Sequence, residues 1–188
     1  MIQLTRSPET KRARLTVDSV TEAGEFGGYA TLFGHVDLGR DRVEQGAFQK
    51  CLRQRSATDV RMLFQHDPCE PIGVWTAIRE DPHGLFVQGR IVADTVKGAE
   101  ILSLMRAGAI DGLSIGFRTR KSRTDRKSGI RSILEADLWE ISIVTFPMLP
   151  QARVSQVKSG PGCPRYSPQS QKTLSAKLRA AARILRSI

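Results

Sequence analysis

Short runs of apolar, β-branched and aromatic residues recur along the first 146 positions and are separated by glycine, proline and polar residues. Runs of this length and composition are typical of β-strands. Polar residues at 39–46 and 121–129 and a turn at 81–84 are expected to connect the strands. The pattern predicts about seven strands, at residues 14–20, 27–34, 60–68, 71–80, 84–92, 112–120 and 130–146, the last of which has room for two.

Two stretches depart from this pattern and predict helices. Residues 47–57 are expected to form a short helix, and residues 94–108 a longer one that Asp94 or Thr95 caps and Gly108 follows. Strands and helices do not alternate regularly, so a β-α-β architecture is not indicated. The expected fold class is mainly β (α+β): a mostly antiparallel barrel or sandwich of about seven strands with helices outside it.

The composition changes after Pro147 and Pro150. Residues 158–171 are rich in proline, glycine, serine and glutamine, which predicts a flexible linker. Residues 172–188 are predicted to form a basic amphipathic helix, because apolar residues recur there at spacings of four, three, four and three. With a polar N-terminal segment at 1–13, the predicted folded domain spans 14–157.

The formal net charge is +10, and its distribution matters more than its size. Eight of the 29 lysine and arginine residues follow Glu140, which is the last acidic residue of the chain. The other 21 stand against 19 acidic residues, so the body is nearly neutral and the excess charge belongs to the tail. A basic tail is typical of an interaction arm, and nucleic acid is a candidate partner only through it.

Composition also limits the class of protein. No stretch approaches the ~18 apolar residues of a membrane span, and the charged N-terminus lacks the apolar core of a secretory signal. Cys51, Cys69 and Cys163 are widely spaced and form no C-x-x-C pair. Neither a disulfide framework nor a metal site is indicated, no cofactor motif is present, and a reducing cytoplasm fits best.

Residues 112–116 read Gly-Leu-Ser-Ile-Gly, which is the G-x-S-x-G pattern of the nucleophile elbow in α/β-hydrolases. That fold needs a histidine after the serine, whereas all three histidines of this chain precede Ser114. It also needs a helix after the serine, whereas residues 117–129 are polar and do not have a helical pattern. The α/β-hydrolase interpretation is therefore excluded by chain order and by context.

Another serine mechanism stays open. In an extended strand Ser114 would face away from Leu113 and Ile115, because side chains alternate between the two faces. Its neighbours Gly112 and Gly116 would then leave room for a substrate backbone to approach. The alternative is a small residue that faces a crowded interior.

A serine nucleophile needs a base that takes its proton and a third group that orients the base. His66 follows an apolar run, where a histidine is well placed to face a cleft, although a capping or surface role is the alternative. His35 and His83 lie in loop-like sequence and are weaker candidates.

Glu140 interrupts the apolar run 138–146. A carboxylate there is costly to bury unless a partner such as an imidazole N–H satisfies it. In a regular strand it would share a face with Leu138 and Ser142, and the alternative is a solvent-facing position on an edge strand. The rival carboxylates are Glu135 and Asp137, which are more easily solvated, and Asp111, which is close to Ser114 along the chain.

Four segments together resemble the tailed-bacteriophage prohead (capsid maturation) proteases. They are GGYATLFGHVD followed by GAF, LFQHDPCEPIGVW, DGLSIGF, and DLWEISIVTFPMLPQARV. They occur in the family's order and cover roughly residues 14–155. The resemblance implies a serine endopeptidase whose fold is similar to the herpesvirus maturation protease (assemblin), a closed β-barrel surrounded by helices.

The resemblance also implies site residues and partners. The family's histidine, serine and acidic member fall on His66, Ser114 and Glu140, whereas herpesvirus enzymes have a second histidine as the third member. The implied substrates are the scaffolding segment of the major capsid protein and the protease itself, inside the assembling prohead in the host cytoplasm. No cofactor is implied.

One alternative is a non-enzymatic β-barrel capsid-assembly factor whose basic tail binds scaffold or nucleic acid. Self-association, the cleavage preference and the oxyanion hole stay open. Backbone N–H groups near Gly116 and the side chain of Arg118 are candidates for the oxyanion hole.

Overall fold

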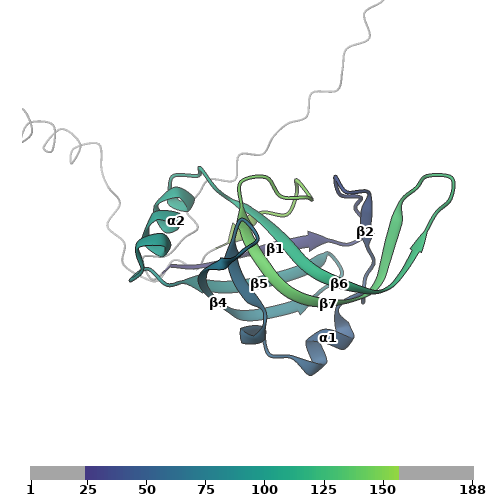
Figure 1. Cartoon of the computed structure of the whole chain (residues 1–188), viewed down its shortest axis with the longest axis horizontal. Coiled ribbons are helices and arrows are strands. Elements are labelled where there is room, and N and C mark those ends of the chain that lie inside the picture. Colours follow the sequence, from purple (N-terminus) through teal and green to yellow (C-terminus); the bar gives the residue numbers. More distant parts are fainter. Residues whose placement is uncertain (1–23, 157–188) are drawn as a thin grey trace, which may run out of the picture. The chain divides into compact units, whose positions relative to one another are not determined.

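The computed structural model describes residues 24–156 (Figure 1). The predicted N-terminal segment, the strand at 14–20, the linker at 158–171 and the amphipathic helix at 172–188 lie outside the described residues. Within them, no helix is long and apolar enough to cross a membrane. No group of three or more potential metal-ligating side chains gathers anywhere in the same range.

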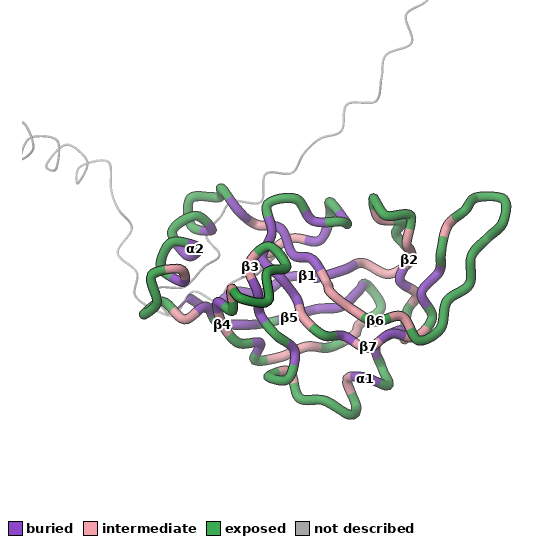
Figure 2. The backbone as a smooth tube through the Cα atoms, viewed as in Figure 1, coloured by how far each residue is buried: buried purple, intermediate pink, exposed green. Residues whose placement is uncertain are grey.

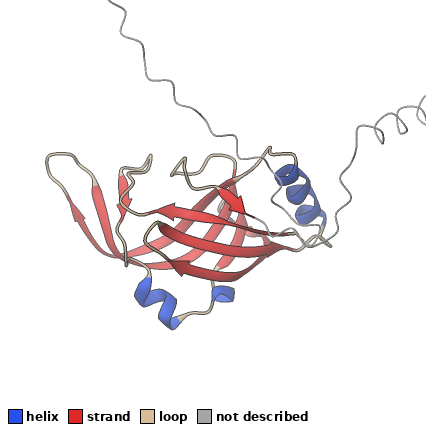
Figure 3. Cartoon of the chain, turned by 180° about the vertical axis from the view of Figure 1, so that it is seen from behind, coloured by secondary structure: helices blue, strands red, loops and turns tan. Residues whose placement is uncertain are grey.

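The described chain is mainly β with few helices, as predicted (Figure 3). The helical elements are α1 (Gln49–Gln54), a 3₁₀ turn (Ala57–Asp59) and α2 (Val96–Arg106). The strands are β1 (Glu25–Leu32), β2 (Asp41–Val43), β3 (Arg61–Phe64), β4 (Asp67–Glu80), β5 (Gly84–Ile91), β6 (Gly112–Thr124), β7 (Arg131–Val144) and β8 (Val154–Gln156).

All eight strands belong to one curled sheet. β7 lies between β6 on one edge and both β2 and β3 on the other, and β4, β5, β1 and β8 follow from β3. Most neighbours are antiparallel, but β2 and β3 both run parallel to β7. The parallel pairing of β3 with β7 matters for the site, because it joins segments that lie far apart along the chain.

The sheet does not close into a barrel. β6 and β8 are not paired as strands, and the only bridge between these two segments joins Gly112 of β6 to Arg153, the residue before β8. Beside it, the Leu113 N–H donates to the Ala152 carbonyl at 3.0 Å and the Val154 N–H to the Asp111 carbonyl at 2.9 Å. β8 is only three residues long, so it cannot follow β6 further. The predicted closed barrel is therefore not confirmed, and the described residues form an open half-barrel.

The core consists mainly of buried residues from the strands of the curled sheet, and α1 and α2 each add buried side chains to it (Figure 2). Trp75 of β4 and Phe48, which caps α1, are fully buried, and α1 packs against β7 and β4. Thr95 caps α2 as expected, because its hydroxyl accepts the Gly98 N–H. α2 packs against β4 and buries its apolar face, Ile101, Leu102 and Met105.

Several predicted boundaries are wrong, and each error has a local cause. Residues 39–46 contain the short strand β2, which is stabilised by pairing with β7 rather than by its own composition. The run 60–68 is not one strand, because the chain turns at Gln65 and His66 and Pro68 already belongs to β4. β6 continues to Thr124, since pairing with β7 holds polar residues in a strand.

Candidate active site

Ser114 lies near the start of β6, opposite Ser142 of β7. Leu113 is fully buried in the core, so the alternation of the strand turns the Ser114 side chain to the other face, as the sequence predicts. Only 4% of Ser114 is exposed. A hydroxyl at this depth needs a hydrogen-bonding partner, and the turn before β4 supplies it.

His66 lies in the two-residue turn that joins β3 to β4. Phe64 and Asp67 pair on either side of it, and both central residues, Gln65 and His66, have positive φ values, 55° and 62°. Two-residue hairpins favour positive φ at both positions, but usually with asparagine or glycine there. Holding two residues with larger side chains at positive φ costs about 1–3 kcal/mol of conformational free energy each, so contacts elsewhere must stabilise the turn.

Those contacts come from the last residues of β7 and from Thr145, which follows it. The Gln65 N–H donates to the Ile143 carbonyl at 3.0 Å, and the Gln65 side-chain amide donates to the Thr145 hydroxyl at 2.7 Å. The His66 N–H donates to the Ser142 hydroxyl at 3.1 Å. The turn is thus attached at three points to β7 and to the residue that follows it, which directs the imidazole back over the sheet.

The imidazole lies between the serine and the glutamate. Its Nε2 is 2.9 Å from the Ser114 Oγ, and its Nδ1 is 2.6 Å from the Glu140 Oε1. Both distances are hydrogen bonds, and the two ring nitrogens serve different partners. With Nδ1 donating to the carboxylate, Nε2 is left as the acceptor of the serine proton.

Glu140 reaches the imidazole because of a β-bulge. Gly116 pairs with Glu140 and Phe117 with Leu138, so Trp139 has no partner opposite it. Leu138 is buried in the core before the bulge and Ile141 after it, which turns Glu140 to the opposite face. The expectation that Glu140 and Leu138 share a face is therefore wrong.

The glycines also have a different role from the one expected. A Cβ on Gly116 would collide with the side chain of Glu140, and a Cβ on Gly112 with the Val144 carbonyl and the Pro147 ring. The space beside them is therefore occupied by the chain itself. Gly116 lets the Glu140 side chain cross β6 on its way to His66, and it does not leave a channel for substrate.

Ser142 is a site residue that the sequence analysis placed on this face but did not select. It is fully buried, and its hydroxyl donates to the Glu140 Oε2 at 2.6 Å while it accepts the His66 N–H. It therefore holds the carboxylate and the histidine backbone together. Its position two residues after Glu140 on a buried strand was the available signal, since a buried hydroxyl needs polar neighbours.

The charge of the site follows from this geometry. The hydrogen bond to Glu140 raises the pKa of His66 above its ordinary value, and its partial burial opposes that effect. The carboxylate side chain is 14% exposed and the imidazole 41% exposed. The imidazolium form is thus stabilised by a carboxylate that is largely shielded from water.

The other candidate residues lie elsewhere and have other partners. Glu135 pairs with Lys50 and Lys121, Asp137 with Arg120, and Asp111 with Arg153. His83 contacts the ring of Tyr29, and the N–H groups of the same loop bind Asp81. His35 lies in the loop after β1. Cys51 is buried in the core and Cys69 is exposed.

The chain is similar in sequence to a known protein family and to one of its members. Residues 12–161 match the family described as caudovirus prohead serine protease. The prohead protease of Enterobacteria phage HK97 is 35% identical over 142 residues, which cover 74% of this chain and 62% of that protein. The chain therefore spans less than two thirds of the length of this relative.

Two solved structures are also similar. The bacteriophage T4 capsid assembly protease gp21 aligns with a TM-score of 0.56 and 15% identity, over 65% of this chain and 82% of its own, which supports a shared fold. The varicella-zoster virus protease aligns with a TM-score of 0.45 and 13% identity, over 69% and 62% of the two chains.

Proposed function

The chain belongs to the caudovirus prohead serine protease family, and from this premise we propose that it is a serine endopeptidase of phage capsid maturation. The observation that carries the proposal is the hydrogen-bonded series Ser114–His66–Glu140. Each member has the chemistry of one role: a nucleophile, a base and a group that orients the base.

In the first half of the proposed reaction, the Ser114 Oγ attacks the carbonyl carbon of the scissile peptide bond while the His66 Nε2 takes the hydroxyl proton. The tetrahedral intermediate collapses when His66 returns that proton to the amine, which leaves with the C–N bond electrons. An acyl-enzyme on Ser114 remains. Water, deprotonated by the same nitrogen, then attacks the ester and regenerates the serine.

Glu140 accepts the Nδ1–H throughout, which keeps Nε2 free as a base and stabilises the imidazolium that forms when the serine proton moves. Its contribution depends on orientation, because a carboxylate that swings away cannot select the tautomer. The oxyanion needs hydrogen-bond donors of its own. We assign that role to backbone N–H groups near Gly116 or to the Arg118 side chain.

The proposed substrates are the scaffolding segment of the major capsid protein and the chain itself. The proposed site of action is the interior of the assembling prohead in the host cytoplasm. Family membership supports this setting, and no bound cofactor enters the chemistry.

The test compares Ser114→Ala with Ser122→Ala, which removes an exposed serine further along the same strand. Each variant is expressed with the capsid protein, and processing is followed by mass spectrometry. Ser114→Ala is expected to fold with an unchanged circular dichroism spectrum and to abolish cleavage, whereas Ser122→Ala processes normally. A fluorophosphonate should label wild type at Ser114 alone. Unimpaired processing by Ser114→Ala would favour the non-enzymatic assembly factor.

A further inference from the structure

The far end of the β6–β7 pair projects from the sheet as a hairpin (Figure 1). All residues from Arg120 to Gly129 are exposed, yet the strands stay paired up to Thr124 and Arg131. The turn is well formed, because the Asp125 carboxylate accepts the N–H groups of Lys127 and Ser128 at 2.7 and 2.9 Å. The hairpin is therefore an ordered arm.

Basic residues dominate this arm. Those near the sheet are neutralised within the chain, since Arg120 pairs with Asp137 and Lys121 with Glu135. At the tip, Arg123, Arg126 and Lys127 form no ion pair within residues 24–156. The only carboxylate in the turn is that of Asp125, which is committed to the backbone of its own loop.

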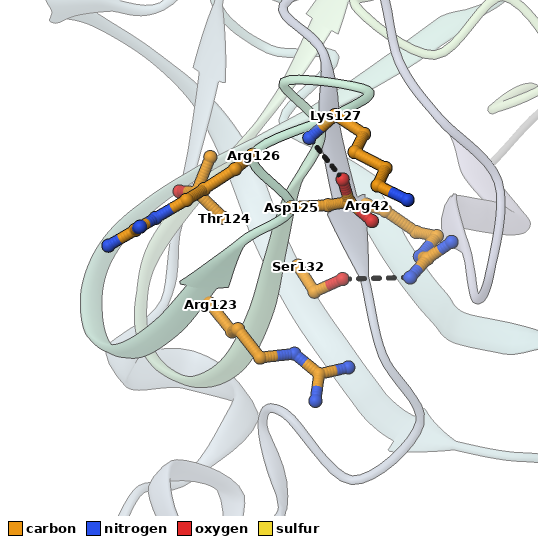
Figure 4. Close-up of a pocket in the computed structure, with 7 residues that line it drawn as sticks. All are labelled: Arg42, Arg123, Thr124, Asp125, Arg126, Lys127 and Ser132. Carbon is orange, nitrogen blue, oxygen red and sulfur yellow. Dashed lines mark hydrogen bonds between the residues drawn. The ribbon is translucent and has the colours of Figure 1, made fainter.

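These cations border a hollow that reaches back to β2 and β7. Arg42 lines it from β2, where its Nε pairs with the Glu44 carboxylate at 2.8 Å and its guanidinium also donates to the Ser132 hydroxyl at 2.9 Å. Figure 4 shows Lys127 and Arg42 extending to the same side of the tip, whereas Arg126 extends to the opposite side. Asp125 is the one carboxylate in the lining, and it accepts the N–H groups of its own turn, so the lining has more cations than carboxylates and also contains serine and threonine hydroxyls, which suits carboxylates.

We propose that this hollow, formed by Arg42, Arg123, Lys127 and Ser132, is an exosite that binds an acidic segment of the polypeptide substrate. The inference rests on the proposed protease function. β6 carries Ser114 at one end and Arg123 at the other, nine residues apart, which at about 3.3 Å per residue is about 30 Å. An extended substrate needs roughly nine residues between the scissile bond and its acidic segment to reach both.

A polypeptide fits better than nucleic acid. The stretch 118–133 contains no aromatic residue on which a base could stack. The cations that line the hollow also extend in different directions from the tip (Figure 4), so they do not form the continuous stripe that a run of backbone phosphates would require. Binding to several carboxylates through exposed cations should be moderate and should weaken with salt.

The binding test uses the full chain carrying Ser114→Ala, which keeps the probe intact, and a fluorescein-labelled glutamate-rich peptide of twelve residues. Fluorescence anisotropy should show binding that weakens with salt and about tenfold weaker binding by Arg123→Ala/Lys127→Ala. The matched control is Arg53→Ala/Arg90→Ala, which removes two exposed arginines elsewhere and should change binding less than twofold. Equal losses in both variants would overturn the exosite. The proposal would also be overturned if a DNA duplex bound more tightly than the peptide and if Arg123→Ala/Lys127→Ala, but not the control variant, lost that DNA binding.

The kinetic test uses the active chain and two substrates that share one cleavage sequence, with and without a glutamate-rich extension ten residues away. The extension should lower the KM of wild type and leave the KM of Arg123→Ala/Lys127→Ala unchanged, with equal kcat on the short substrate. An extension that lowers the KM of both would contradict the proposal. Failure of the proposed protease function would give a different result. Either Ser114→Ala would cleave the substrates or the wild type would not, while the peptide binding measured by anisotropy would be unchanged.

Discussion

The two ends of the β6–β7 pair contrast sharply. At the end within the sheet, Ser114, Glu140 and Ser142 are largely buried, and each side chain has a hydrogen-bonding partner. At the projecting end, Arg123 and Lys127 are exposed and have no ion pair within residues 24–156. One ladder runs through both ends, so secondary structure does not explain the difference.

Burial explains it. An unpaired polar group inside the sheet costs several kcal/mol, roughly 2–7, so only a fully paired arrangement is stable there. An exposed cation keeps its water and needs no partner, and it is therefore available to another chain. The buried end is suited to fixing atoms for chemistry, and the exposed end to binding by charge.

The largest effects should come from the imidazole at the buried end. His66→Ala is expected to lower kcat/KM by about 10⁵-fold, because it removes the base from a unit whose members act together. Glu140→Gln should lower it less, by on the order of 10²- to 10⁴-fold, since the serine and its base remain. Steady-state kinetics on a processed peptide measures both. Equal losses would mean that Glu140 does more than orient the imidazole.

Two glycines allow the two ends to be compared by the same substitution. Gly116→Ala inserts a methyl group where the Glu140 side chain crosses β6, so kcat should fall about 100-fold, within the range of Glu140→Gln. Gly129→Ala at the arm strains a residue with a φ of 68° and should cost about 1 kcal/mol of unfolding free energy with normal kcat. Denaturant melts and kinetics together separate these outcomes. A normal kcat for Gly116→Ala would show that the Glu140 side chain can reach His66 without the space that a glycine at position 116 leaves.

Ser142 should have a smaller effect that acts through Glu140. Ser142→Ala removes the hydroxyl that bonds the Glu140 Oε2, and kcat is expected to fall about tenfold with little change in KM. In a Glu140→Gln background the same substitution should have less effect, because its partner is already altered. Additive losses in this double-mutant cycle would assign Ser142 a purely structural role.

The smallest effect should be a displacement of the pH profile. Glu140 raises the pKa of His66 above its ordinary 6.5, and the base must be neutral, so activity should fall as pH drops through that raised pKa. Glu140→Gln should move this acidic limb to lower pH, while variants of the arm leave it in place. A limb that stays where it is in Glu140→Gln would contradict the pairing.

The same shift affects stability. The folded pKa of His66 lies above its unfolded value. The contribution of the His66–Glu140 interaction to the free energy of unfolding is therefore fully present below about pH 6.5 and is lost as pH rises through the folded pKa. Denaturant unfolding at pH 6 and pH 9 should show the loss in wild type and a smaller loss in Glu140→Gln.

Much of the fold was predictable because its strands have local signals. β1, β5, α1 and α2 lie close to their predicted positions. Elements that depend on a partner were not predictable, such as β2, which is three residues of polar and apolar sequence held by β7. The bulge at Trp139 was not predictable either, because no residue type in the run 138–146 indicates which position lacks a partner on β6.

By itself, the sequence determined which residue types are available and which mechanisms are excluded: one serine between glycines, histidines only before it, and a carboxylate inside an apolar run. Only the tertiary structure decided which of them meet. His66 is 48 residues from Ser114 and 74 from Glu140, and they converge because β3 pairs in parallel with β7 while β6 covers its other edge. Local patterns predict a strand but not its partner, since pairing is set by the packing of the whole sheet.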